Sequence, residues 1–239
     1  MKYQHELADP KTEKLQHPRT QMNYTYEYPR PSVTTDIVIF SIREDKLHVL
    51  LIQRDEEPFE GSWAIPGGFV LMNESLLEGA TRELKEETGL CGIKLEELGS
   101  FSAPDRDPRG RVITVAFVAL VPSDSLVLRP DTDARDAKWF ALDALPELAF
   151  DHPEIMAAAR QRLVAHVTSD VSVSARSAFE FLPEKFTLAQ AQTVFEVLRG
   201  SDLDKRNFRK WIMANWELTD LNEKTFGGRH RPAALYSLD

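Results

Sequence analysis

Cysteine is nearly absent from this chain: Cys91 is the only one in 239 residues. A lone cysteine forms no disulfide within its chain, which is typical of a reducing compartment. Long apolar runs are also lacking. The longest, VITVAFVALV, is shorter than the roughly 18 residues of a membrane span and has the composition of a strand. The N-terminal stretch MKYQHELADPKTEK has no apolar centre like that of a signal peptide. We therefore expect a cytoplasmic protein that enters no membrane.

An excess of positive charge is lacking as well, since the formal net charge is -9. That value excludes a generic polyanion-binding protein. The charge is unevenly divided, however. Residues 183–239 carry 9 Lys and Arg against 8 Asp and Glu, a net of +1, which leaves -10 for the remainder. Two parts of different charge indicate two functions.

Proline, apolar runs and small polar residues together predict four segments. Residues 1–32 form an extended arm, and residues 33–168 alternate strand and helix patterns, which predicts an α/β (α+β) domain. Residues 169–182 form a linker, and residues 183–239 form a second, smaller domain. Near the start of the first domain, VTTDIVIFSI and LHVLLIQR predict neighbouring strands that are buried on both faces.

One helix of the first domain is predicted from local signals at its ends. Ser75 and Glu78 have the spacing of a capping box, and Gly89 has the position of a left-handed stop. Gly79 lies inside this helix, where glycine costs roughly 1 kcal/mol relative to alanine. We interpret Gly79 as a position against which another group packs closely.

Three glutamates share one face of that helix, because steps of three and four residues separate them. They are Glu83, Glu86 and Glu87. Like charges at this spacing repel, so stability alone does not favour them. Carboxylate oxygens are ligands that Mg²⁺ prefers, and the ion would polarise a bound diphosphate for attack by water. The alternative is an exposed acidic helix with ordinary pairs such as Glu78 with Arg82.

The spacing around this helix resembles the signature of the Nudix hydrolases. Gly68, Glu74 and residues 82–90 match Gly-x5-Glu-x7-Arg-Glu-apolar-x-Glu-Glu-x-Gly-apolar at every position. The resemblance implies an α/β/α sandwich in which the Gly67 carbonyl helps to hold a metal and Arg82 and Glu74 orient the helix. It implies that the residues that bind the metal, and act in catalysis if the protein is active, are Glu83, Glu86 and Glu87.

A loop further along, APDRDPRGR, gathers three arginines. Arginine suits two-point phosphate contacts and stacking on bases. The alternative is a solvated loop with internal Asp–Arg pairs. Beside a Nudix helix, this stretch resembles family members that bind ADP-ribose. The ligand-binding residues that the resemblance implies are Gly67, Gly68, Phe69, Arg82, Arg106, Asp107, Arg109 and Arg111.

Many Nudix enzymes use a further carboxylate outside the signature. Asp131, Asp133 and Asp136 in RPDTDARDA are the candidates, and the sequence does not choose between them.

The second domain has the order of a winged helix-turn-helix. FTLAQAQTVFEVLRG predicts a helix between a Thr187 cap and Gly200, and LDKRNFRKW predicts a second, basic helix. A strand pair around GGRHRP follows. The first turns of such a second helix meet base edges in the major groove, where Asn and Arg read adenine and guanine. The expected DNA-binding residues are Thr187, Lys205, Arg206, Asn207, Arg209, Lys210, Arg229, His230 and Arg231.

The alternative is a winged helix that contacts another protein. The absence of acidic residues between positions 205 and 216, in a chain of negative net charge, favours DNA.

Both halves together resemble the Nudix-related transcriptional regulators of NAD metabolism. FTLAQAQTVFEVLRG, LDKRNFRKW and GGRHRPAALY, joined to a Nudix domain with DRDPRGRV, carry the resemblance. It implies a homodimeric repressor of NAD-biosynthesis or salvage genes that binds a palindromic operator in double-stranded DNA and is released by ADP-ribose. The complete signature keeps two alternatives: a Mg²⁺-dependent ADP-ribose pyrophosphatase with an accessory C-terminal domain, or a bifunctional protein.

Overall fold

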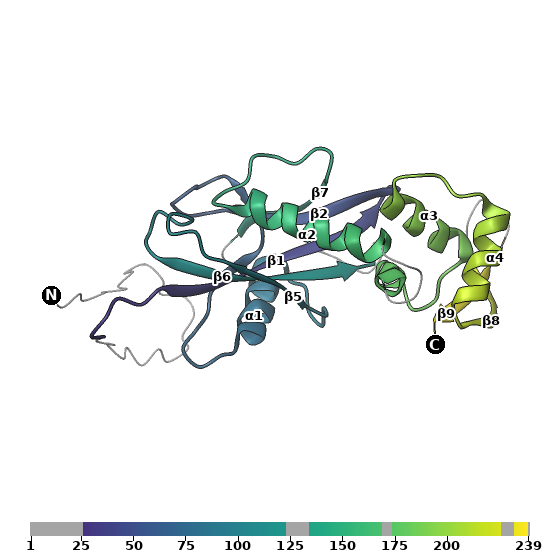
Figure 1. Ribbon diagram of the computed structural model, residues 1–239, viewed down its shortest axis with the longest axis horizontal. Helices are drawn as coiled ribbons and strands as arrows, with labels where there is room; N and C mark the ends of the chain where they lie inside the picture. The colour runs from purple at the N-terminus through teal and green to yellow at the C-terminus, as the bar shows by residue number, and fades with distance from the viewer. Residues whose placement is uncertain (1–25, 123–133, 169–173, 226–231, 239) are drawn as a thin grey trace.

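The computed structural model describes residues 26–122, 134–168, 174–225 and 232–238. Figure 1 shows an elongated molecule, with a sheet and its helices at one end and a small helical unit with a strand pair at the other. Of the predicted arm, residues 1–25 lie outside the described ranges, and the remainder is irregular up to the first strand. In the described ranges, no helix combines the length and apolar character that crossing a membrane requires.

The larger unit is built on a seven-stranded sheet. Its two longest strands, β1 (Ser32–Arg43) and β6 (Val112–Val121), pair in parallel, and β2 (Lys46–Arg54) pairs antiparallel with β1. The path runs β3-β2-β1-β6-β5, with β4 on β1 and β7 on β2. The remaining strands are β3 (Trp63–Ala64), β4 (Gly67–Phe69), β5 (Glu96–Phe101) and β7 (Ala134–Ala141).

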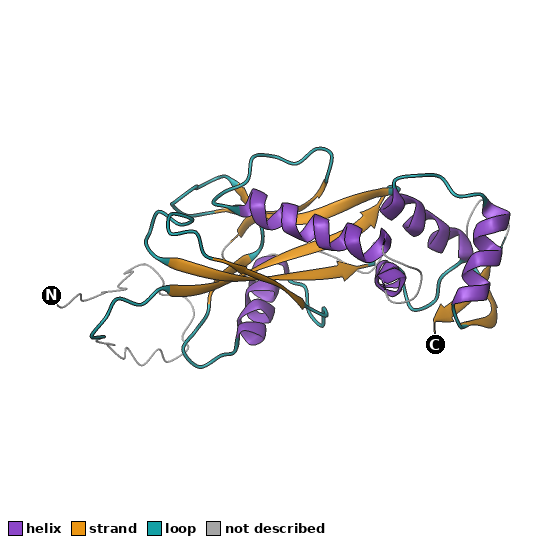
Figure 2. Cartoon of the chain, viewed as in Figure 1, coloured by secondary structure: helices purple, strands orange, loops and turns teal. Residues whose placement is uncertain are grey.

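One helix covers each face of this sheet (Figure 2). Along β1, Ile37 and Ile39 join the core under α1 (Leu76–Thr88), whereas Val38 and Phe40 join the core on the other face, under α2 (His152–Thr168). Alternate residues of a strand point to opposite faces, so a continuous apolar run is needed when both are covered. The α/β/α sandwich is confirmed.

The smaller unit is the predicted winged helix. Helix α3 (Leu188–Arg199) is followed by α4 (Lys205–Asn215), and β8 (Leu218–Lys224) pairs antiparallel with β9 (Ala234–Leu238). Thr187 and Gly200 cap α3 as predicted. The apolar side of α4 packs on α3, with rings of Phe208 and Phe195 5.6 Å apart.

The predicted linker, residues 169–182, differs from the structure. A 3-10 helix, η1 (Ser174–Phe181), occupies most of it, and residues 169–173 lie outside the described ranges. The small polar residues before it suggest a tether, but Phe179 and Phe181 are apolar and buried. The Phe179 ring lies 4.9 Å from that of Trp216 and 5.9 Å from that of Phe195. The free energy gained by burying these rings orders this segment, although the residues before it have the composition of a flexible linker.

This packing makes the core continuous between the two units. One cluster of buried side chains includes Phe40 and Ile155 from the sandwich and Phe195, Ile212 and Tyr236 from the winged helix. Helix α2 contacts both η1 and α3. The winged helix is therefore packed against α2 through side chains of the shared core.

Candidate functional site

Helix α1 begins and ends where its local signals predict. The Ser75 side chain accepts from the Glu78 amide, and the Glu78 carboxylate accepts from the Ser75 amide at 2.7 Å. Gly89 ends the helix at a φ of 75°. The close packing at Gly79 is also confirmed, because a Cβ there would lie 3.0 Å from a carboxylate oxygen of Glu74. The absence of a side chain at residue 79 lets Glu74 lie close against the helix.

The turn at β4 brings the backbone close to both β1 and α1. A Cβ on Gly67 would collide with the Thr35 carbonyl, and a Cβ on Gly68 would collide with the Glu83 carboxylate. The Gly67 amide donates to Glu87 at 2.7 Å. The two glycines therefore allow the carboxylate face of α1 to lie directly against this turn.

Arg82 divides the nearby carboxylates into two groups. Its Nε and Nη2 donate to Glu74 at 3.0 and 2.8 Å, and Nη2 also donates to the Phe69 carbonyl. Its Nη1 donates to Glu83 at 2.7 Å and to Glu86 at 3.1 Å. The hydrogen bond with Glu74, aided by Glu83, raises the pKa of Arg82 despite partial burial. The guanidinium thus supplies positive charge that the crowded carboxylates require.

The carboxylate oxygens on α1 are of the type that binds Mg²⁺. In this structure the guanidinium of Arg82 contacts two of these carboxylates. Within the described ranges, no three His, Cys, Asp or Glu side chains gather closely enough to hold a metal ion. Arg82 Nη1 takes oxygens of Glu83 and Glu86, and Glu87 accepts from the Gly67 amide. Hard carboxylate oxygens are nevertheless what Mg²⁺ prefers. An ion bound by Glu83 and Glu86 would have to displace Nη1, while Nε and Nη2 could keep Arg82 on Glu74.

The loop between β5 and β6 brings Arg109 to the turn at Gly67 and Gly68, which we call the signature turn. Arg109 pairs with Asp107 at 2.7 Å, and its side chain is 41% exposed. Its guanidinium carbon lies 5.0 Å from the centre of the Phe69 ring. Arg111 instead turns back and donates to two carbonyls of its own loop. Arg109 and Phe69 are therefore brought together as predicted ligand-binding residues, whereas Arg111 braces the loop.

Arg106 differs from a ligand-binding residue at the surface. It is 8% exposed, and its Nε and Nη2 form a two-point ion pair with Asp151 at 2.8 and 2.7 Å. Asp36 lies 3.4 Å from the same Nη2. A buried guanidinium needs such carboxylates, because an uncompensated buried charge is strongly destabilising. Arg106 and the equally buried Asp107 therefore stabilise the loop that carries Arg109 from inside the protein.

The same buried cluster includes His152, the first residue of α2. Its Nδ1 accepts from the Ile65 amide at 2.9 Å, so a neutral ring carries its proton on Nε2, 3.6 Å from Asp36. Burial lowers the pKa of His152, which keeps the ring neutral at neutral pH. The cluster ties the signature turn and the arginine loop to the start of α2.

Three residues beside the site are absent from the sequence prediction. The guanidinium carbon of Arg54, at the end of β2, lies 4.8 Å from the centre of the Phe150 ring. Phe59 meets Phe150 edge-on at 4.8 Å, and Arg109 lies 5.5 Å from the same ring. A lone phenylalanine in the acidic loop DEEPFEGS is a signal for Phe59. No sequence signal identifies Arg54 and Phe150, because only the folded chain brings them next to Phe59.

One of the candidates for a further carboxylate lies in the described part of the chain. Asp136 lies in β7 and pairs with Lys138. Asp131 and Asp133 lie outside the described ranges.

Helix α4 presents its basic residues to solvent. It begins after Asp204, whose carboxylate accepts from the Asn207 amide at 2.9 Å, and Phe208 and Ile212 are buried beneath it. The exposed side chains are Lys205, Arg206, Asn207, Arg209 and Lys210.

Thr187 differs from this exposed set. It is buried, and its hydroxyl caps α3 by accepting from the Gln190 amide. The predicted wing residues Arg229, His230 and Arg231 lie outside the described ranges.

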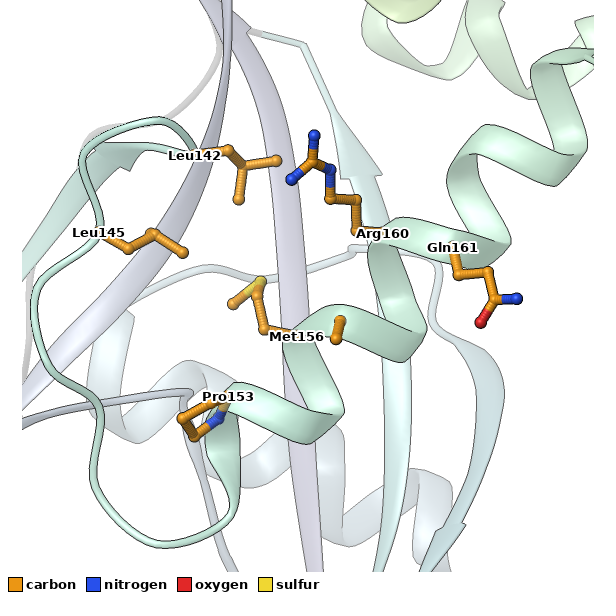
Figure 3. Close-up of a pocket in the computed structure, with 7 residues that line it drawn as sticks. Leu142, Leu145, Pro153, Met156, Arg160 and Gln161 are labelled. Atoms are coloured by element: carbon orange, nitrogen blue, oxygen red, sulfur yellow. The ribbon is translucent and has the colours of Figure 1, made fainter.

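A pocket of about 560 Å³ lies on the other face of the sheet (Figure 3). It is lined by Leu142, Leu145, Pro153, Met156, Ala157, Arg160 and Gln161. The lining includes no carboxylate, and α2 and the loop before it form its walls. It is therefore separate from the carboxylate face of α1.

Comparison with known proteins divides the chain in the same way. A family model of the NUDIX domain matches residues 32–159, and one of the NrtR DNA-binding winged helix domain matches residues 178–238. The chain is 33% identical over 214 residues to the ADPR responsive transcriptional repressor NtrR of Acinetobacter baylyi, which covers 88% of this chain and 83% of that protein. It is 44% identical over 129 residues to the ADP-ribose pyrophosphatase of Methanocaldococcus jannaschii, covering 54% and 73%.

Solved structures of a third relative, Shewanella oneidensis NrtR, are also similar. Its complex with a 27mer DNA has a TM-score of 0.71 and 33% identity, covering 87% of this chain and 93% of that chain. Its NUDIX domain complexed with ADP ribose has a TM-score of 0.52 and 34% identity, covering 57% and 90%.

The close approach at Gly67 can be tested with two glycines of similar φ. Gly67 and Gly110 have φ values of 156° and 152°, but a Cβ on Gly110 would meet nothing within 4 Å. We expect Gly110→Ala to lower the free energy of unfolding by about 1–3 kcal/mol through backbone strain. Gly67→Ala adds a collision with Thr35 and should cost about 1–3 kcal/mol more. Chemical denaturation measures both, and equal losses would contradict the steric argument.

Proposed function

The chain belongs to the Nudix family, in the group whose Nudix domain is followed by an NrtR winged helix, and we propose that it is an ADP-ribose-responsive transcriptional repressor. The winged helix binds double-stranded DNA, and the Nudix domain binds ADP-ribose. Bound ADP-ribose releases the DNA. The controlled genes serve NAD biosynthesis or salvage, and the protein acts as a homodimer in the cytoplasm.

The observation that carries the DNA-binding role is the exposed face of α4. Five exposed basic or amide side chains occupy its first two turns, and acidic residues are absent from positions 205–216. Asp204 acts as the helix cap, so its carboxylate is engaged by the backbone. A helix with this face, docked on α3 by its apolar side, suits the major groove, where phosphates position it and Arg and Asn read bases.

The site on the sandwich suits a nucleoside diphosphate sugar. Arg109 can contact a phosphate or stack on a base, and it lies beside Phe69 at the signature turn. Mg²⁺ held by Glu83, Glu86 and Glu87 would neutralise the diphosphate and polarise its phosphorus. These are complementary charges for the effector named for the Acinetobacter baylyi relative.

A chain of contacts supports coupling between effector and DNA. The Arg109 loop includes Arg106, whose two-point ion pair reaches Asp151. The Asp151 carbonyl accepts the first backbone hydrogen bonds of α2, from the amides of Glu154 and Ile155. Helix α2 packs against η1 and α3. A ligand that shifts the arginine loop therefore biases the start of a helix on which the winged helix rests.

A second function, hydrolysis of ADP-ribose, is favoured by the complete signature. The 44% identity with an ADP-ribose pyrophosphatase covers this part of the chain. Water would attack a phosphorus of the diphosphate, and the products would be AMP and ribose 5-phosphate. Glu83, Glu86 and Glu87 would hold the metal, and the general base is left unassigned. Repression and hydrolysis are compatible in one protein.

DNA reading by α4 can be tested with single substitutions. Arg206→Ala or Asn207→Ala should weaken specific binding by about 1–3 kcal/mol and relax base preference, because each removes a base-reading side chain. Half-sites in the operator should be about one helical turn, or a multiple of it, apart. Fluorescence anisotropy at fixed salt measures binding, and Arg160→Ala, an exposed arginine of α2, is the control. A full-length protein that prefers no genomic fragment over random DNA would contradict the repressor.

Coupling can be tested through Asp151. In the unsubstituted protein, saturating ADP-ribose should weaken DNA binding about 5- to 150-fold, the usual range of a coupling free energy. Asp151→Asn breaks the two-point pair with Arg106, so the ratio of DNA affinities with and without ADP-ribose should fall towards one. Each ligand alone should still bind. Glu154→Gln, an exposed position in the first turn of α2, is the control. An unchanged ratio in folded Asp151→Asn would exclude this route.

Hydrolysis can be tested by incubating the protein with ADP-ribose and Mg²⁺ and measuring AMP. If the protein is active, Glu86→Gln should lower the rate at least about 100-fold, because a lost metal ligand removes charge stabilisation in the transition state. Glu97→Gln, exposed on β5, should not change the rate. No AMP from the unsubstituted protein would leave the Nudix domain as a sensor alone.

A further inference from the structure

An aromatic and cationic cluster lies beside the signature turn, outside the residues that the family signature contains. It consists of Phe59 and Phe150, whose rings meet edge-on at 4.8 Å, with Arg54 at 4.8 Å and Arg109 at 5.5 Å from the Phe150 ring centre. Phe69 is joined to it through Arg109. We call these five residues the ring platform.

Exposure distinguishes the ring platform from ordinary core packing. Phe59 is 40% exposed and Phe69 is 42% exposed, although Phe59 lies in the acidic loop DEEPFEGS. Large apolar side chains grouped at a polar surface are typical of binding sites. Their apolar faces are only partly covered by the protein itself.

Backbone conformation adds a second, independent observation. Phe59 and Phe150 have φ values of 66° and 53°, in the left-handed region that a bulky residue rarely adopts. Each such residue costs of the order of 1–3 kcal/mol, and such costs gather at ligand sites. Two neighbouring rings that touch and share this conformation are better explained by function than by stability.

Charge provides the third observation. Both hydrogen bonds from the Arg54 side chain go to backbone carbonyls, those of Pro58 and Glu56. Burial lowers the pKa of Arg54, and the charge of Arg109 lowers it further, while Glu87 opposes the shift. Two guanidiniums therefore lie near each other and near the carboxylate helix. Asp107 already pairs with Arg109 at 2.7 Å, so the cluster offers a ligand guanidinium planes for stacking and N–H donors rather than a large excess of positive charge.

A molecule that joins an aromatic ring to a diphosphate matches these three observations. We propose that the ring platform binds the adenine end of ADP-ribose, with the base stacked on Phe59 and the adjoining phosphates contacted by Arg54 and Arg109. The assignment rests on the proposed function, since it takes ADP-ribose as the effector. It makes Phe59 the residue that distinguishes a nucleotide sugar from a simple sugar phosphate.

The test measures affinity and base stacking together in the full-length protein. ADP-ribose is titrated by calorimetry, and the absorbance of its adenine near 260 nm is recorded at saturation, because stacking lowers that absorbance. Phe59→Leu keeps an apolar side chain without a ring. It should weaken ADP-ribose about 10- to 100-fold, as loss of one base–aromatic stack does, and should restore most of the absorbance at saturation.

Two further variants separate stacking from other roles. Arg54→Gln should weaken ADP-ribose while keeping the lowered absorbance, because its contact is with phosphate. Leu77→Ala, a 51% exposed position on α1, should change neither quantity. Wild-type affinity in Phe59→Leu, or weaker affinity with wild-type absorbance at saturation, would overturn the assignment. Failure of the unsubstituted protein to bind ADP-ribose at all would instead contradict the proposed function.

Discussion

A guanidinium buried beneath the signature turn is the interaction on which this arrangement depends. Arg106 can remain inside only while carboxylates face it, since the uncompensated charge would be strongly destabilising. Asp36 comes from β1 and Asp151 from the residue before α2, so one charge fixes three segments that are remote in sequence. The turn at Gly67 lies on Asp36, and Arg109 extends from the same loop as Arg106. The turn at Gly67 and the arginine loop therefore both rest on this buried cluster.

The surface of the site has the opposite electrostatic problem, an excess of negative charge. Glu83 and Glu86 share one nitrogen of Arg82, while the other nitrogens of that side chain hold Glu74. Arg82 is therefore both an anchor for the helix and the cation that compensates two of its carboxylates. A metal ion at Glu83 and Glu86 would therefore compete with this arginine contact for the same oxygens.

Much of the fold and part of the site could be predicted because the deciding signals are local. The caps at Ser75 and Gly89 and the continuous apolar run of β1 depend on neighbours in sequence. The burial of Arg106 could not be predicted in this way, because its partners lie 70 and 45 residues away and nothing in DRDPRGR separates a buried arginine from an exposed one. The 3-10 helix η1 was hidden by the small polar residues before it. The aromatic side chains of η1 are buried because the winged helix packs against them.

The continuous core has a consequence for how such proteins can recombine in evolution. The Nudix family model ends at residue 159, inside α2, and the winged-helix model begins at residue 178, inside η1. The stretch that belongs to neither model includes Leu163 of α2, which is in the shared core. An exchange of DNA-reading modules between relatives would therefore join surfaces that had not adapted to one another. A new operator specificity is acquired more easily by changing the exposed face of α4, which the core does not touch, than by exchanging the whole unit.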